Sequence, residues 1–218
     1  MKQRYSIAFR LPSAVLLSQL IITSLVAGTE ASGQQPGGSL HDRAKQQGGR
    51  LVEGFKADRS VVYPNLTELA RRSTSIVIGR TLTNRAHLTT DGNFITTDCS
   101  VGVQEVLKGS VRRGSVVLVS LPGGSHRFAD GVKATLTATN YRPAEKGRTY
   151  LFFLKEKGAI TKGLELAGGV QGLYDLDFAA NTVVPADVVP KASIVQWCRN
   201  KSIKEFLVEL HRAVGKAK

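Results

Sequence analysis

Alternation of apolar and polar positions is the dominant pattern of the chain between residues 75 and 178. The segment 94–107 is long, alternating and rich in β-branched residues, and the parity shared by every second position of 95–103 is typical of a strand that buries one face. Residues 132–139 alternate in the same way, whereas the continuous apolar run 150–154 predicts a central strand. Four more strands are predicted where apolar runs end at turn residues: 75–80, 116–121, 164–167 and 172–178.

Turn signals separate most of these seven runs, and glycine is frequent, with 22 of 218 residues. Asp91-Gly92 and Arg113-Gly114 are turn dipeptides, and Asn181 is expected at a hairpin tip. No helical pattern among the runs is long enough for a crossover between parallel strands. We therefore expect antiparallel pairing, as a closed or nearly closed barrel or as a sandwich.

A short helix is predicted ahead of the strands, over residues 64–72. Asn65 can cap its first turn, and Glu68 lies three residues later, which approximates a capping box.

A longer amphipathic helix is predicted near the C-terminus, where apolar residues recur at helical spacing over 203–214. Ser202 and Glu205 form the pattern of a capping box at its start. The surrounding segment 191–218 carries seven Lys or Arg against two Glu. A helix docked on the barrel with a solvated basic face is favoured over a dedicated anion site.

The first 33 residues have the pattern of a secretory signal peptide: basic residues, a short apolar stretch over 11–27, and small residues after it. The alternative is an uncleaved anchor helix, which the polar interruptions of the apolar stretch disfavour. The segment 34–56 begins with Gly, Gln and charged residues and is predicted to be a disordered linker. Residues 57–190 form the predicted β-barrel domain, followed by the basic C-terminal helix 191–218.

Two cysteines are present, Cys99 and Cys198. In an exported protein they could form a disulfide. The alternative for Cys99 is a small buried apolar residue, because it shares the inward parity of the segment 95–103.

The candidate chemistry of the sequence is sparse. Ser125 and His126 are adjacent, so on an extended chain they point to opposite faces and do not readily form a nucleophile–base pair. Asp175 and Asp177 share one strand face, which favours a solvated face over acid–base work. The four histidines have no partner at metal-ligand spacing, so no catalytic residue, metal site or cofactor is predicted.

The order of several segments resembles that of small exported bacterial proteins, most of them uncharacterised. These segments are 75–80, Val103-Gln104-Glu105-Val106-Leu107-Lys108-Gly109, 116–119 with Pro122-Gly123-Gly124, and 147–154. The same order is similar to the OB-fold barrel of the netrin-like module, which includes the tissue inhibitors of metalloproteinases. The resemblance covers about residues 57–190 and implies a small antiparallel OB-like barrel. Those inhibitors begin with a Cys-x-Cys that this chain lacks, so no inhibitor residue carries over.

These observations predict an exported, non-enzymatic module that binds an envelope or extracellular macromolecule, in the periplasm or outside the cell. The expected partner is an unknown protein or an anionic envelope polymer, since the net charge is +13. The alternatives are a protease-inhibitor-like module acting through a loop, nucleic-acid binding, disfavoured because aromatic residues are few, and an enzyme of unfamiliar design. The candidate contact surface is the basic pair and the glycine-rich loop, namely Arg112, Arg113, Gly123, Gly124, Ser125, His126 and Arg127. Plain turns are the alternative for both segments.

Overall fold

The computed structural model describes residues 38–58, 61–157, 163–189, 193–198 and 201–217. The predicted signal peptide and the first part of the predicted linker lie outside these residues. No helix among the described residues is long and apolar enough to cross a membrane.

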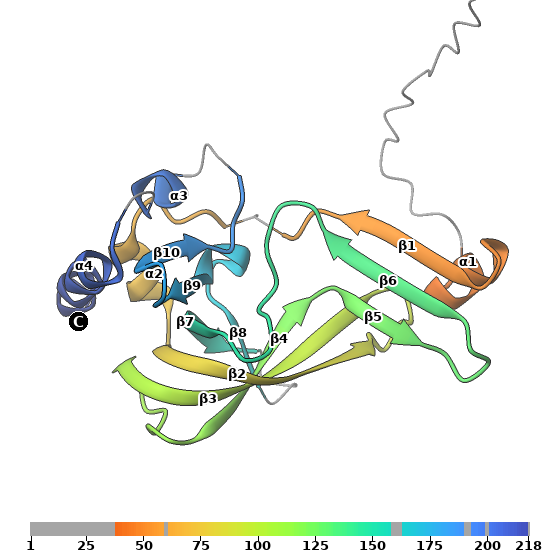
Figure 1. Ribbon diagram of the computed structural model, residues 1–218, viewed down its shortest axis with the longest axis horizontal. Helices are drawn as coiled ribbons and strands as arrows, with labels where there is room; N and C mark the ends of the chain where they lie inside the picture. The colour runs from red at the N-terminus through yellow and green to blue at the C-terminus, as the bar shows by residue number, and fades with distance from the viewer. Residues whose placement is uncertain (1–37, 59–60, 158–162, 190–192, 199–200, 218) are drawn as a thin grey trace, which may run out of the picture. The chain divides into compact units, whose positions relative to one another are not determined.

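The fold is mainly β, as predicted, and its largest element is a seven-stranded sheet with the order β10-β9-β7-β2-β3-β4-β8 (Figure 1). Its strands are β2 (Ser75–Leu88), β3 (Ile95–Lys108), β4 (Val116–Pro122), β7 (Thr149–Glu156), β8 (Leu164–Leu166), β9 (Leu173–Asp177) and β10 (Thr182–Pro185). Strand β8 pairs with both β4 and β7, so the pairings lead from β7 through β2, β3, β4 and β8 back to β7. The β4–β8 ladder is only two residue pairs long, and the barrel is not formally closed.

Strand β7 separates two apolar clusters, because successive side chains of a strand point to opposite faces. Phe152 belongs to the cluster inside the barrel, together with Val101 and Val119. Phe153 belongs to a second cluster, which helices cover from outside. The run 150–154 is buried on both faces, which confirms the prediction of a central strand.

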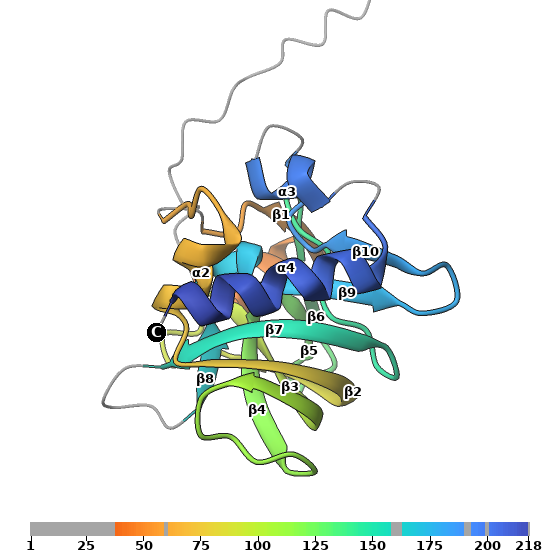
Figure 2. The same cartoon turned by 90° about the vertical axis from the view of Figure 1, so that its left-hand side faces the viewer.

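Three helices pack on the outer face: α2 (Leu66–Arg72), α3 (Ser193–Cys198) and α4 (Ile203–Lys216). Figure 2 shows α4 lying across β7 and β9, with α2 beside it. The predicted capping box of α4 is present, and Phe206 and Leu210 of its apolar stripe are fully buried. Asn65 caps α2 by accepting a hydrogen bond from the Glu68 N–H, as predicted. The Glu68 carboxylate, however, pairs with Arg71 at 2.7 Å instead of completing the predicted capping box.

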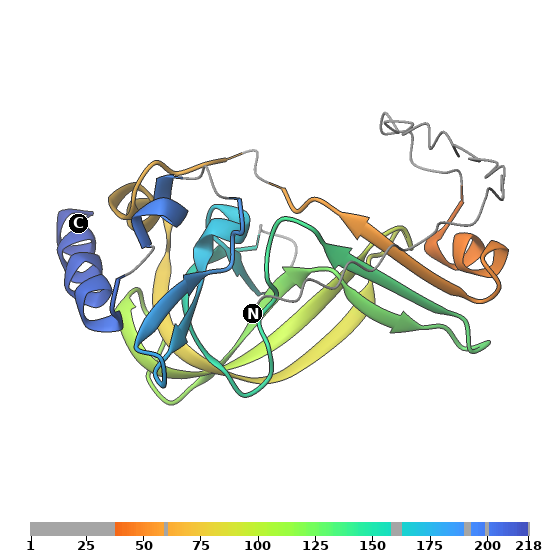
Figure 3. The ribbon, with the colours of Figure 1, turned by 45° about the horizontal axis from the view of Figure 1, so that its top comes forward.

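A second, three-stranded sheet has the order β1-β6-β5. It consists of β1 (Arg50–Phe55), β5 (Gly124–Arg127) and β6 (Lys133–Ala138), and helix α1 (Leu40–Gln46) lies against β1 (Figure 3). The prediction of a disordered linker over 34–56 is therefore wrong from Leu40 to Phe55. Leu40, Ala44 and Leu51 are buried because Ile95, Ala134 and Leu136 from distant parts of the chain cover them.

Two other features of the strand pattern differ from the prediction. The segment 124–127, expected as part of a glycine-rich loop, is strand β5 and pairs with β6. Two pairings, β1 with β6 and β4 with β8, are parallel rather than antiparallel. Other strands lie between the two members of each pair in the sequence, so the chain returns for parallel pairing by way of these strands and needs no single crossover helix.

Cys99 and Cys198 are both free and buried, so the disulfide that the sequence left open is not formed. Cys99 lies in the cluster inside the barrel, whereas Cys198 lies in the cluster beneath the helices. Because these clusters occupy opposite faces of the sheet, the two thiols are separated by the backbone of the strands. Cys99 is therefore the buried apolar residue of the alternative prediction.

Candidate functional site: a cleft between the two sheets

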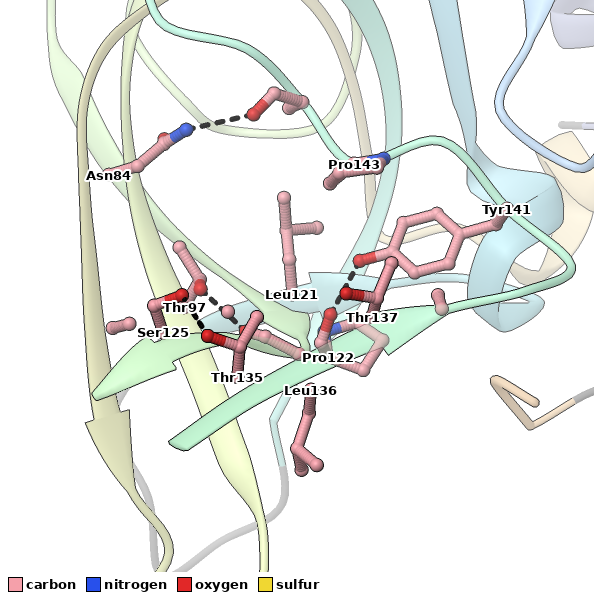
Figure 4. A pocket seen from close by; sticks show the side chains of 15 residues that line it. Asn84, Thr97, Leu121, Pro122, Ser125, Thr135, Leu136, Thr137, Tyr141 and Pro143 are labelled. Carbon is pink, nitrogen blue, oxygen red and sulfur yellow. Dashed lines mark hydrogen bonds between the residues drawn. The ribbon is translucent and has the colours of Figure 1, made fainter. Parts of the chain in front are cut away.

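A cleft of about 450 Å³ lies where the three-stranded sheet meets the long strands β2 and β3. Figure 4 shows Asn84 of β2 on one wall, Tyr141 and Pro143 of the β6–β7 connection on the other, and Leu121 between them. Its lining is Asn84, Ala86, Thr97, Leu121, Pro122, Gly123, Gly124, Ser125, Thr135, Leu136, Thr137, Ala138, Tyr141, Pro143 and Ala144. The volume is within the range of ordinary ligand sites.

Two glycines allow the chain to pass from one sheet into the other at the base of the cleft. Gly123 and Gly124 have φ angles of 88° and 132°, a region that favours glycine. A Cβ atom on Gly124 would lie 2.5 Å from the Thr97 Oγ1 atom, and one on Gly123 would lie 2.9 Å from the Leu136 carbonyl oxygen. Glycine at position 124 therefore allows β5 to lie directly against β3, and glycine at position 123 allows the chain to pass close to β6.

Polar side chains hold the cleft walls together through hydrogen bonds to backbone carbonyls. Thr97 donates to the Gly123 carbonyl oxygen at 2.6 Å, and Tyr141 donates to that of Pro122 at 2.6 Å. The Asn84 amide donates to the Ala144 carbonyl oxygen at 2.8 Å. These bonds connect β2, β3, β4 and the β6–β7 connection, so the walls are fixed before any ligand arrives.

The cleft is electrically neutral, because no charged side chain is among its described lining residues. Burial raises the pKa of the Tyr141 phenol well above its ordinary value, so this hydroxyl remains a neutral donor. The remaining lining combines hydroxyl groups with Leu, Pro and Ala side chains. Such a surface suits a ligand that is uncharged, partly apolar and able to form hydrogen bonds.

The structure does not gather the predicted contact residues into one site. Gly123, Gly124 and Ser125 line the cleft, whereas His126 packs edge-on against Phe128, with ring centroids 4.9 Å apart. Arg127 is exposed at the end of β5.

Arg112 and Arg113 lie elsewhere, in the exposed β3–β4 connection. The β3–β4 ladder runs from Thr96 opposite Pro122, at the cleft, to Gly102 opposite Val116, next to this connection. The arginine pair is therefore at the opposite end of the ladder from the cleft. The structure does not bring the two predicted contact segments together.

Ser125 and His126 are directed to different surroundings. The Ser125 hydroxyl bonds to that of Thr135 at 2.7 Å, and His126 faces Phe128. This arrangement matches the expectation that neighbouring strand residues point apart.

The two aspartates of β9 take part in an ion-pair network outside the cleft. Arg148 lies 2.8 Å from Asp175 and 3.5 Å from Asp177, measured between its Nη2 atom and the carboxylate oxygens. Burial raises the pKa of the Asp175 carboxyl, and Arg148 partly offsets that effect. Sequence reasoning identified the shared face but not Arg148 as the partner.

Sequence reasoning missed most of the cleft: Asn84, Thr97, Thr135, Thr137 and Tyr141 were not candidates. Thr135 and Thr137 occupy the polar positions of an alternating strand. This pattern predicts that both side chains face away from the core, but it does not indicate a binding site.

The comparisons with known proteins assign no family to the chain. No protein-family profile matches it, and no curated protein matches its sequence significantly. Among the described residues, no group of three or more His, Cys, Asp or Glu side chains could hold a metal ion.

Proposed function

We propose that this protein is a non-enzymatic binding module that acts outside the cytoplasm and holds an extended, uncharged segment of a partner protein in the cleft. The observation that carries the proposal is the neutral lining, which combines hydroxyl groups with the side chains of Leu, Pro and Ala. An extended peptide offers the matching surface, because its amides need hydrogen-bond partners and its side chains need apolar contacts.

A peptide fits this lining better than a carbohydrate or an anionic polymer does. Tyr141 is the aromatic residue of the lining, but it is only 3% exposed and cannot offer its ring face to a sugar. An anionic polymer would find no cation among the described lining residues. The positive net charge of the chain is therefore assigned to the general surface rather than to the cleft.

The strand order supports an OB-like barrel as part of the same proposal. The ring of pairings through β2, β3, β4, β8 and β7 has five strands and is partly open, as in the OB fold. Location outside the cytoplasm is proposed from the pattern of the first 33 residues.

A displayed library of short linear peptides tests the proposal, with the purified protein as bait. We expect enrichment of peptides that lack charged residues and carry small, apolar or hydroxyl side chains. Thr137→Arg should weaken the best peptide at least about tenfold, because Thr137 is exposed within the cleft and the guanidinium would fill it. Thr83→Arg is the matched control, because Thr83 is exposed on β2 but does not line the cleft.

Two results would overturn the proposal. One is the absence of enriched peptides. The other is equal weakening by Thr137→Arg and Thr83→Arg, which would place peptide binding outside the cleft.

A further inference from the structure

A second hollow, separate from the cleft, lies between the three helices on the outer face of the barrel. It has a volume of about 470 Å³, within the range of small-molecule sites. We call it the helical groove, and its lining is Pro64, Asn65, Leu66, Thr67, Ile194, Trp197, Glu209, Arg212, Ala213 and Lys216. Its base is apolar, because Leu66, Ile194 and Ala213 belong to the cluster beneath the helices.

The helical groove has an excess of positive charge at its exposed side. Its single carboxylate, Glu209, is already paired with Lys201 at 2.9 Å. Arg212 and Lys216 are exposed one turn apart on α4, and neither forms an ion pair with any residue that the structure describes. Two cations beside an apolar base are complementary to a ligand with an anionic head and an apolar body.

The walls of the helical groove favour an alkyl chain over a peptide as the apolar body. One wall is the 14-residue helix α4, whose backbone N–H groups at Glu209, Arg212 and Ala213 are bonded within the helix. A peptide would bring amides that find few partners here, and each unpaired amide costs free energy. An alkyl chain has no such requirement.

We propose that the helical groove binds a single-chain amphiphile with a carboxylate head, such as a free fatty acid. The alkyl chain lies against Leu66, Ile194 and Trp197, and the carboxylate lies between Arg212 and Lys216. This site is independent of the cleft and of the function proposed for it.

The chain carries its own reporter for this site, because Trp197 is the only tryptophan and lines the groove. The probe is dodecanoate, titrated below the concentration at which it forms micelles and followed by tryptophan fluorescence. We expect a saturable change in emission. Dodecanol, which lacks the charge, and butanoate, which lacks the tail, should each bind at least about tenfold more weakly.

A double variant tests the two cations. Arg212→Gln with Lys216→Gln should weaken dodecanoate binding at least about tenfold, since both charge-assisted contacts are lost. The matched control is Lys204→Gln with Lys146→Gln, which removes two charges at exposed positions that do not line the groove. Equal far-UV circular dichroism spectra of the variants establish that each is folded.

Three outcomes would overturn this proposal: no saturable response to dodecanoate, equal affinity for dodecanol, or equal weakening by the two double variants. Binding to anionic vesicles without binding to monomeric dodecanoate would also overturn it, because electrostatic attraction of the basic surface to the vesicles would then explain the result. Thr137→Arg should leave dodecanoate binding unchanged, so failure of this site and failure of the peptide cleft are distinguishable.

Discussion

The two sheets of this protein are stabilised in different ways. The barrel region (β2–β4, β7–β10 and α2–α4) buries both faces of its central strands in two large apolar clusters. The α1 region (α1, β1, β5 and β6) has a much smaller cluster, centred on Leu40, Leu51 and Leu136. The difference shows that a segment poor in apolar residues can be ordered when strands distant in the sequence supply the apolar side chains that cover it.

Charged contacts supplement the small cluster of the α1 region. The Arg43 Nη1 atom lies 2.6 Å from both carboxylate oxygens of Glu53, which joins α1 to β1. Asp130 of the β5–β6 turn accepts from His41 at 2.9 Å and from Lys45 at 3.1 Å. These pairs fix where α1 lies but add little free energy, because most of the groups are partly exposed.

The largest expected effect is the loss of a side chain inside the barrel region. Phe152→Ala should lower the free energy of unfolding by about 3–5 kcal/mol, because Phe152 is fully buried in the central strand. Urea denaturation followed by circular dichroism measures this change. Phe178→Ala is the control, since Phe178 is 62% exposed and should cost little. Similar losses in both variants would contradict the assigned core.

A smaller and local effect is expected in the α1 region. Leu51→Ala should cost about 2–3 kcal/mol and open this region ahead of the barrel. Hydrogen exchange should then accelerate at amides of α1, β1 and β6, while those of β7 keep their protection. The neighbouring Val52→Ala, at a side chain 60% exposed, should leave exchange unchanged. Uniform acceleration across both regions would show that they open as one unit.

The smallest expected effect concerns the capping box of α4. Ser202→Ala should cost about 1 kcal/mol, because the Ser202 hydroxyl accepts the Glu205 N–H at 3.2 Å. The Ser202 backbone N–H and then its hydroxyl also hold the pKa of the Glu205 carboxyl below its ordinary value. A lowered carboxylate pKa stabilises the folded state above the unfolded pKa, and this contribution disappears as the pH falls through the folded pKa.

Thermal unfolding at several pH values checks this linkage. Between about pH 5 and pH 3, the wild type should lose more stability than Ser202→Ala, because the variant lacks one of the bonds that lower the pKa. Lys204→Ala, one residue into the same helix but outside the box, should retain the wild-type pH dependence. Parallel acid profiles for the wild type and Ser202→Ala would contradict this role of the box.

Much of the barrel region could be predicted from sequence because its information is local. The inward parity of 95–103 and the apolar run 150–154 each indicate a strand without reference to any partner. The same is true of α4, where Ser202 and Glu205 mark the start and the apolar spacing marks the buried stripe. The hairpin tip at Asn181 is also correct, with a φ of 52° between β9 and β10.

The α1 region could not be predicted in this way because its burial depends on residues remote in sequence. Leu40 and Leu51 stand among Gly, Gln and charged residues, and only the position of Ala134 and Leu136 makes them core residues. The parallel pairings are likewise set by the path of the chain rather than by local pattern. The cleft could not be predicted from local pattern either, because Asn84, Thr97 and Tyr141 come together only when the two sheets pack against each other.

The two free thiols determine how this protein would meet an oxidising environment. Burial raises the pKa of both thiols, that of Cys198 to about 12. In the folded protein neither cysteine therefore supplies an appreciable amount of thiolate to an oxidant. Unfolding exposes both sulfurs at once. An oxidant would therefore leave the thiols of folded molecules unmodified and oxidise those of unfolded molecules.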